Sequence, residues 1–242
     1  MEVLNDVLGY KNLKIYQNTD YFSFSLDSVF LANYSTIRLR DKSIVDFCTG
    51  NGIVPLILSR RTYRNIIGVE IQKELSVLAN KSVKFNNLDK QITIINEDVK
   101  IFCNNYLNFF DLVLCNPPYF KNDDNNTKNL SYEKMVARHE VLIDLNEICY
   151  CASRVLKDNG TFSIVHRSDR FMDVINSFKN NNIEPKRIKF VYDTINSNST
   201  LVLIEGQKAG KVGLIIDKPL IIHNLDGTYT DEYEKLQLEV NK

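Results

Sequence analysis

The fold of this chain is decided by the stretch Asp46-Phe47-Cys48-Thr49-Gly50-Asn51-Gly52. An apolar run, Ser43–Phe47, predicts a buried strand that leads into it, and residues 52–60 could begin a helix. Glycines between a strand and a helix let the backbone turn tightly and approach a ligand closely. The glycine pattern is too short for a dinucleotide fingerprint and no Walker lysine follows, so we expect no phosphate cradle. Asp46 suits a ligand group with positive charge, although a plain strand–helix turn is an equal alternative.

Apolar runs and helical segments alternate along the rest of the chain. The predicted strands are Asn65–Glu70, 91–95, 111–115 and 160–166, and the predicted helices are Lys73–Phe85, 145–156 and 169–179. This alternation is typical of a parallel sheet with helices on both faces, an α/β fold. Residues 186–192 and 200–205 are rich in β-branched side chains and are expected to pair as antiparallel strands. We predict an N-terminal appendage over residues 1–42, which forms part of the substrate site, and one domain over residues 43–242.

The composition excludes few classes of function. The 242 residues are 44% hydrophobic and 25% charged with a formal net charge of zero, so nucleic-acid binding would need a local basic patch. Five cysteines without zinc-site spacing indicate reduced thiols in a cytoplasmic protein, and we expect no metal site. No signal peptide and no apolar run long enough to span a membrane is found in the sequence.

Two acidic residues follow predicted strands and could hold a nucleoside. Glu70 ends the strand after the glycine loop, and a carboxylate at that position can accept hydrogen bonds from two ribose hydroxyls. Asp98 follows the next strand and could accept from the amino group of an adenine ring. A solvated carboxylate for Glu70 and a helix N-cap for Asp98 are the simpler alternatives.

The most specific motif is Asn116-Pro117-Pro118-Tyr119, directly after the predicted strand 111–115. Two prolines cannot continue a strand, and they stiffen a loop at the edge where open α/β sheets bind ligands. The Asn116 side-chain oxygen and the Pro117 carbonyl then form two convergent acceptors, and Tyr119 offers a ring for stacking. Such groups suit an amino group conjugated to a planar ring, because two acceptors favour a more tetrahedral and more nucleophilic nitrogen.

These motifs resemble those of the class I S-adenosylmethionine-dependent methyltransferases that modify planar amino or amide nitrogens. The resemblance implies a doubly wound, mostly parallel, seven-stranded Rossmann-like sheet with an antiparallel C-terminal strand pair. It also implies roles for residues around the cofactor S-adenosylmethionine: the methionine part would lie along Asp46, Thr49, Gly50, Asn51 and Gly52, the ribose on Glu70, the adenine on Asp98, and the target amine on Asn116, Pro117 and Tyr119, with Asn116 also lining the cofactor site.

Other segments narrow the resemblance to bacterial tRNA methyltransferases that act on the adenine 3′ of the anticodon. The segments are residues 21–32, Ala137-Arg138-His139-Glu140, and the tail around residues 201–211. In that family the substrate is a valine tRNA and the product is N6-methyladenine, so a tRNA partner is expected. The candidate substrate-binding residues are Tyr21, Arg138, His139, Lys208 and Lys211, although a merely solvated face is an equal alternative for the two lysines.

Three other functions remain open from the sequence. A glutamine methyltransferase for release factors shares the Asn-Pro-Pro-Tyr motif, but its helical N-terminal domain is larger than the roughly 40 residues available here. A DNA or ribosomal RNA adenine methylase is the second alternative, although little room is left for a target-recognition domain. A non-catalytic RNA-binding relative is the third, and the intact motif at Asn116 counts against it. The tRNA isoacceptor and the oligomeric state are not decided.

Overall fold

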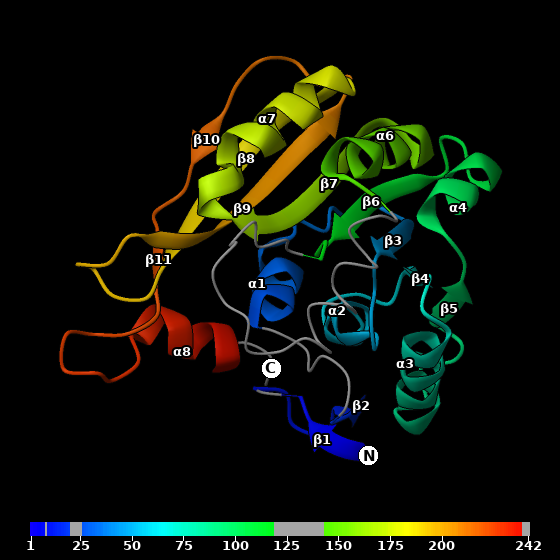
Figure 1. The fold of residues 1–242 in the computed structure, drawn as a ribbon, viewed down its shortest axis with the longest axis horizontal. Coiled ribbons are helices and arrows are strands. Elements are labelled where there is room, and N and C mark those ends of the chain that lie inside the picture. The colour runs from blue at the N-terminus through cyan, green and yellow to red at the C-terminus, as the bar shows by residue number, and fades with distance from the viewer. Residues whose placement is uncertain (8, 20–25, 119–142, 239–242) are drawn as a thin grey trace, which may run out of the picture.

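The computed structural model describes residues 1–7, 9–19, 26–118 and 143–238, and its centre is one large sheet (Figure 1). The spatial order of the sheet is β5-β4-β3-β6-β7-β9-β8, with two short strands on the outer side of β8. The strands are β3 (Ser43–Phe47), β4 (Asn65–Glu70), β5 (Ile92–Asn96), β6 (Phe110–Cys115), β7 (Leu156–Arg167), β8 (Ile183–Tyr192), β9 (Ser199–Lys208), β10 (Ile215–Ile216) and β11 (Leu220–Ile221). Strand β9 runs antiparallel to both of its neighbours, and the other pairs in the sheet are parallel. The predicted fold class, with its antiparallel C-terminal pair, is therefore confirmed.

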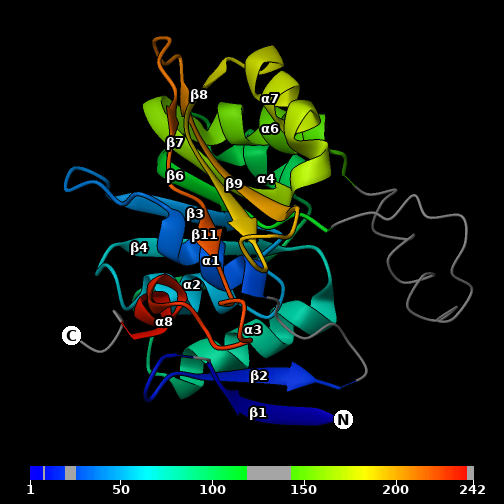
Figure 2. The ribbon, with the colours of Figure 1, turned by 90° about the vertical axis from the view of Figure 1, so that its left-hand side faces the viewer.

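Helices cover both faces of the sheet. The helices are α1 (Leu26–Tyr34), α2 (Ile53–Leu58), α3 (Lys73–Phe85), α4 (Val99–Asn105), α6 (Leu145–Val155), the short η1 (Ser168–Arg170), α7 (Phe171–Asn180) and α8 (Asp231–Leu238). Helices α4, α6 and α7 lie on one face, and α1 and α2 lie on the other (Figure 2). Successive residues of β3 show why two layers are needed, because Ile44 packs into one core and Val45 into the other.

The register of the parallel strands brings their carboxyl ends to one edge. Phe47 at the end of β3 pairs with Cys115 of β6 on one side and with Val69 of β4 on the other. At the end of β4, Glu70 pairs with Asn96 of β5. The segments that follow these four strands therefore begin side by side, which is where open α/β sheets bind ligands.

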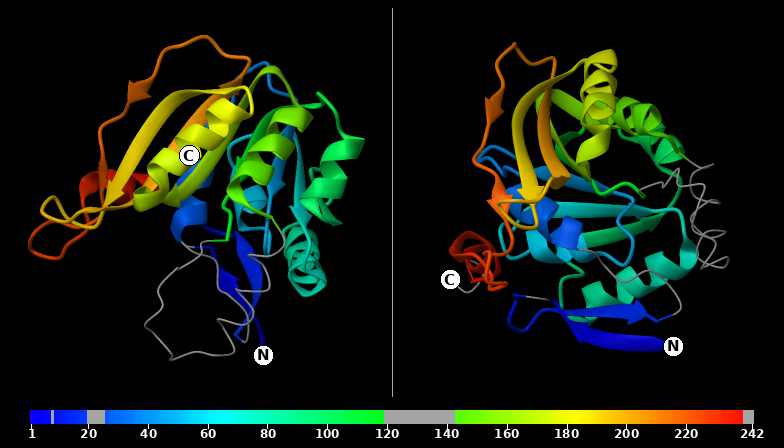
Figure 3. Two further views of the ribbon diagram at one scale, coloured as in Figure 1. Left: turned by 45° about the horizontal axis from the view of Figure 1, so that its top comes forward. Right: turned by 60° about the vertical axis from the view of Figure 1, so that its left-hand side comes forward.

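The N-terminal residues form a hairpin and a helix that were not predicted from the sequence. Strands β1 (Glu2–Asp6) and β2 (Lys14–Asn18) make an antiparallel hairpin outside the main sheet, drawn in dark blue in Figure 3. The hairpin is fixed to α3, because the Tyr16 backbone N–H donates to Ser82 Oγ at 2.9 Å. Helix α1 instead belongs to the main core, where Leu31 is fully buried. The predicted boundary at residue 43 stays a prediction, although α1 shares its core with the sheet.

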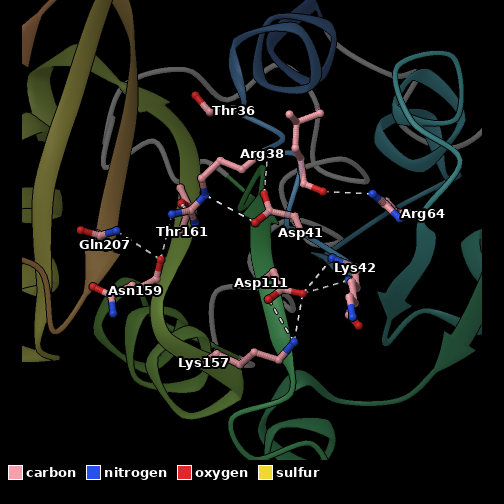
Figure 4. A network of polar contacts seen from close by, with 12 residues as sticks. Thr36, Arg38, Asp41, Lys42, Arg64, Asp111, Lys157, Asn159, Thr161 and Gln207 are labelled. Carbon is pink, nitrogen blue, oxygen red and sulfur yellow. Dashed lines mark hydrogen bonds and ion pairs between the residues drawn. The ribbon is translucent and has the colours of Figure 1, made fainter.

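The opposite edge of the sheet, where the strands begin, is closed by charged side chains (Figure 4). Both oxygens of Asp111 lie 3.0 Å from Lys157 Nζ, and Oδ2 also accepts from the backbone N–H groups of Lys42 and Ser43. Nearby, an Arg38 guanidinium N–H donates to Thr161 Oγ1 at 2.6 Å. These bonds join the start of β3 to β6 and β7. Across the described ranges, none of the helices is long and apolar enough to cross a membrane.

Candidate active site

The loop after β3 is a tight turn with left-handed backbone conformations. Cys48, Gly50 and Gly52 have φ values of 55°, 58° and 88°. At Gly52 an added Cβ would lie 3.2 Å from the Cβ of Ala79, so that glycine is needed both for its conformation and for its close approach to α3. The Thr49 backbone N–H donates to the carbonyl of Val69 at 3.0 Å, which fastens the loop to β4.

Two buried polar atoms, one at the end of β3 and one in the loop after it, have no hydrogen-bond partner among the described residues. Asp46 is 1% exposed, and its Oδ2 accepts from Thr49 Oγ1 at 2.5 Å, whereas its Oδ1 is left unsatisfied. The side-chain nitrogen of Asn51 is likewise buried and unsatisfied. Burial raises the pKa of Asp46 to about 8. Each unmet group costs about 1–3 kcal/mol, so a bound ligand with both an ammonium and a carboxylate group would satisfy this pair.

Glu70 lies beside that loop and is buried, with 4% of its surface exposed. Its Oε2 accepts from the Gly50 N–H and its Oε1 from the Gln72 N–H, each at 2.8 Å. Burial raises the pKa of Glu70, while the backbone N–H groups lower it. The simpler interpretation of a solvated carboxylate is wrong. A carboxylate has about four lone-pair sites, so its backbone donors leave acceptor capacity that ribose hydroxyls could use.

Asp98 is the N-cap of α4. Its Oδ1 accepts from the Lys100 backbone N–H at 2.8 Å, as the alternative interpretation from the sequence expected. The side chain is half-buried and follows β5 at the same edge as Glu70. An N-cap can carry out a second role, and the contact between Asp98 and an adenine ring stays a prediction.

Asn116 is the first residue after β6, next to the loop after β3. Its side chain is half-buried, and its Nδ2 donates to Ser28 Oγ of α1 at 2.8 Å. Pro117 is buried, so the backbone beyond β6 is held against the protein. At the carboxyl edge, neighbouring strands thus bring together an amide side chain, two buried carboxylates and a glycine turn.

A comparison with protein families identifies the kind of protein that has such a carboxyl edge. The family model of the methyltransferase small domain matches residues 25–191, which include every element named at this edge. This chain belongs to the methyltransferase small-domain family. Among its relatives, a protein of Haemophilus influenzae (strain PittEE) named tRNA1(Val) (adenine(37)-N6)-methyltransferase is 26% identical, with 94% of each chain covered. One of the same name from Bacteroides fragilis (strain YCH46) is 25% identical over 69% of this chain and 71% of its own.

Solved structures share the fold of this methyltransferase small-domain protein. A structure described as a predicted O-methyltransferase from Agrobacterium tumefaciens has a TM-score of 0.68 at 17% identity, covering 87% of this chain and 95% of that one. A geranyl diphosphate C-methyltransferase from Streptomyces coelicolor A3(2), in complex with S-adenosyl-L-homocysteine, has a TM-score of 0.53 at 12% identity, covering 76% and 77%.

The residues of the edge fit S-adenosylmethionine as the methyl donor of this family. The ammonium and carboxylate groups of its methionine part match the unsatisfied Asp46 Oδ1 and Asn51 Nδ2. The ribose hydroxyls match the remaining acceptor capacity of Glu70. In the part of the chain that the structure describes, no group of three or more His, Cys, Asp or Glu side chains is placed to hold a metal ion.

The structure does not bring two of the predicted substrate residues to this edge. Lys208 ends the antiparallel strand β9, and its Nζ donates to Asn108 Oδ1 at 2.6 Å and to the Leu156 carbonyl at 2.8 Å, close to the start of β6 and β7. Lys211 follows three residues later. Both lie at the opposite edge of the sheet from Asn116. Nothing here tests the predicted contacts with tRNA, and this location favours the alternative of a role outside substrate binding. The predictions for Tyr21, Tyr119, Arg138 and His139 fall outside the described residues.

Two residues that support the site were missed in the sequence. Ser28 contacts Asn116, but the two lie 88 positions apart. Gly68 of β4 leaves room for Thr49, because an added Cβ would lie 2.9 Å from Thr49 Oγ1 and 2.9 Å from Ile94 Cδ1. The only signal for Gly68 was a glycine inside an apolar strand, which often marks close approach of a neighbour.

Proposed function

We propose that this methyltransferase transfers a methyl group from S-adenosylmethionine to the exocyclic N6 amino group of an adenine in a tRNA anticodon loop. The proposal rests on the position of Asn116. Its amide is hydrogen-bonded to Ser28, and the residue follows β6 directly beside the loop after β3, where the cofactor would bind. The names of the relatives, which cover most of this chain, favour tRNA over a release factor, ribosomal RNA or DNA.

In this proposal, much of the catalysis comes from the relative placement of the methyl donor and the target amine. Because Phe47 pairs with Cys115, the loop that holds the cofactor and the residue that holds the target follow adjacent strands. Holding two reactants in line replaces a bimolecular encounter, and good alignment contributes several kcal/mol, about 7–11 at best. The rigid turn at Gly52 and the buried Pro117 keep the two sides of the site in place.

Asn116 and Pro117 prepare the nucleophile. The lone pair of an adenine amino group is delocalised into the ring. The Asn116 side-chain oxygen accepts one amino hydrogen and the Pro117 carbonyl accepts the other, which favours a tetrahedral nitrogen with its lone pair localised. Bound S-adenosylmethionine supplies an electrophilic methyl group on a sulfonium. The new bond between nitrogen and the methyl carbon forms as the bond from that carbon to sulfur breaks, and S-adenosylhomocysteine is the leaving group. The methylated nitrogen is then acidic, so its proton leaves to solvent without a strong base.

The finer substrate assignment comes from the relatives. We infer a valine tRNA and the adenine 3′ of its anticodon, and hence an enzyme that works in the cytoplasm with tRNA. Single-stranded loop bases are the usual targets of RNA recognition, and extruding a loop base costs only a few kcal/mol. Such a base can therefore reach Asn116 at the carboxyl edge of the sheet.

The test uses radiolabelled S-adenosylmethionine and total tRNA from a strain that lacks the modification. Unaltered protein and Asn116→Ala are compared, after both are shown to bind S-adenosylhomocysteine. Digestion to nucleosides should give labelled N6-methyladenosine with the unaltered protein and at least about 100-fold less with the variant. Label in ribosomal RNA or in a release factor, with none in tRNA, would contradict the proposal.

A further inference from the structure

A buried hydrogen bond connects α1 to the residue proposed to hold the target. Ser28 lies in the first turn of α1 and is 6% exposed. Its Oγ accepts from Asn116 Nδ2 at 2.8 Å. The bond therefore joins the N-terminal helix to the end of β6 across the carboxyl edge of the sheet.

This bond holds the nitrogen end of the Asn116 amide. An asparagine side chain donates from its nitrogen and accepts at its oxygen, and the torsion that exchanges the ends is broad. An adenine amino group presents hydrogens, so it requires the oxygen. A flipped amide would direct N–H groups at N–H groups. In this structure Ser28 Oγ accepts from Nδ2, which places Oδ1 at the other end of the amide. A serine hydroxyl can also donate, so what the bond supplies is the placement of the amide seen here.

We propose that Ser28 is a positioning residue that holds the Asn116 amide in place, with its nitrogen on Ser28 and its oxygen toward the amino group to be methylated. The inference rests on the proposed function, because it assumes a target with amino hydrogens. It adds a residue of α1 to the requirements of the reaction without placing that residue in contact with cofactor or substrate.

The helix that carries Ser28 is itself held firmly, as this role requires. Directly after α1, the Thr36 backbone N–H donates to Glu205 Oε1 of β9 at 2.6 Å, and Glu205 is 4% exposed. Ser35 donates to Leu31 and shares a 2.8 Å hydrogen bond with Ser163 of β7. The guanidinium of Arg187 lies 4.2 Å from the ring centre of Tyr34. These contacts leave α1 little freedom to move relative to the sheet.

Ser35 offers a matched control. It is also a buried serine beside α1 that hydrogen-bonds to a strand of the main sheet, but its partner is on β7 and not at the site. If burial of a serine hydroxyl were all that mattered, Ser28→Ala and Ser35→Ala would have the same effects. Only Ser28→Ala should change the chemical step.

The first experiment measures kcat and KM for tRNA, Kd for S-adenosylhomocysteine, and the melting temperature of both variants. We expect Ser28→Ala to lower kcat about 10-fold, which corresponds to the loss of one buried hydrogen bond. KM for tRNA and Kd for S-adenosylhomocysteine should each change less than about 2-fold. Ser35→Ala should keep kcat near that of the unaltered protein well below its melting temperature. Ser28→Thr, which keeps the hydroxyl, should lose less than about 3-fold. Equal losses of kcat in Ser28→Ala and Ser35→Ala, or in Ser28→Ala and Ser28→Thr, would overturn the proposal.

A second measurement is one that a purely structural role would not change. In an Asn116→Ala background the side-chain amide is absent, so Ser28 has nothing left to hold. Single-turnover rates should then show a loss of less than about 2-fold for Ser28→Ala, against about 10-fold with Asn116. The same loss in both backgrounds would overturn the positioning role. If the unaltered protein did not methylate tRNA at all, the proposed function would fail and this inference with it.

Discussion

The backbone N–H of Gly50 donates to Oε2 of Glu70 at 2.8 Å, and this bond joins the loop after β3 to the end of β4. The same carboxylate also accepts from the Gln72 N–H. Glu70 therefore shapes the cofactor loop and, in our proposal, also holds the ribose. A residue with both tasks should be more sensitive to substitution than a carboxylate with one.

Two replacements of Glu70 should weaken cofactor binding to different extents. Glu70→Gln keeps the size but loses one acceptor oxygen, and Glu70→Ala removes both. We expect Kd for S-adenosylhomocysteine, measured by calorimetry, to rise about 10-fold for the first and about 100-fold for the second. Glu74→Gln, at an exposed position on α3, is the control and should leave Kd unchanged. Equal Kd values for all the proteins would show that Glu70 does not hold the cofactor.

The pH dependence of cofactor binding should report on Asp46. Its pKa is raised by burial from 3.8 to about 8. The folded protein thus holds this proton more tightly than the unfolded chain, so the stability from this group is complete below about pH 4 and is lost as pH rises through about 8. An ammonium group bound at Oδ1 needs the ionised form, so binding below about pH 8 must release a proton.

We therefore expect the affinity for S-adenosylhomocysteine to increase from about pH 6 to about pH 8, by up to about 10-fold per pH unit. At still higher pH the α-amino group of the ligand loses its own proton, and the affinity should fall again. Calorimetry in buffers of different ionisation enthalpy measures the released proton. Asp46→Asn should bind weakly with no rise over this range, and a rise that persisted in that variant would assign the titration to another group.

Gly68 should be intolerant of alanine because of Thr49. The added Cβ would lie within 3.0 Å of both branches of the Thr49 side chain. We expect Gly68→Ala to lower the free energy of unfolding by about 1–3 kcal/mol. Thr49→Ala removes the contacts with Thr49 and leaves only the flexible end of Ile94 close to the added Cβ, but it also removes the hydrogen bond to Asp46. The cost of Gly68→Ala in chemical denaturation should therefore be smaller in a Thr49→Ala background than in the unaltered protein. An equal cost in both backgrounds would mean that the strain arises elsewhere.

The location of Lys208 predicts a structural effect and no catalytic one. Its Nζ bonds to Asn108 and to the Leu156 carbonyl, at the edge away from Asn116. Lys208→Ala should cost about 1 kcal/mol of stability and leave KM for tRNA within about 2-fold. A large rise in KM, with a weaker salt dependence of binding, would show instead that tRNA reaches around to this edge.

The strands and the helix with the strongest hydrophobic patterns could be predicted from the sequence. Ser43–Phe47, Asn65–Glu70 and Lys73–Phe85 have the same bounds in the structure as in the prediction, because apolar runs and helical spacing are unambiguous there. Helix α1 was missed because six of its nine residues are buried, so it lacks the polar face that marks a surface helix. Helix α8 and the hairpin of β1 and β2 were missed as well.

The candidate site was predicted as a set of residue types but not as a set of contacts. The glycine loop and the two acidic residues follow strands, and their shared edge follows from parallel pairing. The bond between Ser28 and Asn116 depends on how α1 packs across the sheet, which no local pattern encodes. The burial of Glu70 likewise depends on the turn at Gly50, which bonds to it through its backbone.

The most direct test of the proposed methyl transfer to adenine N6 uses a synthetic anticodon stem-loop of valine tRNA. One RNA carries adenine 3′ of the anticodon, and a matched RNA carries purine there, which lacks only the exocyclic amino group. Transfer of the labelled methyl group from S-adenosylmethionine is measured with each. We expect label in the adenine RNA alone, in N6-methyladenosine, and its loss with Asn116→Ala. Equal labelling of both RNAs would contradict the proposal, because the methyl group would then be accepted by an atom other than N6.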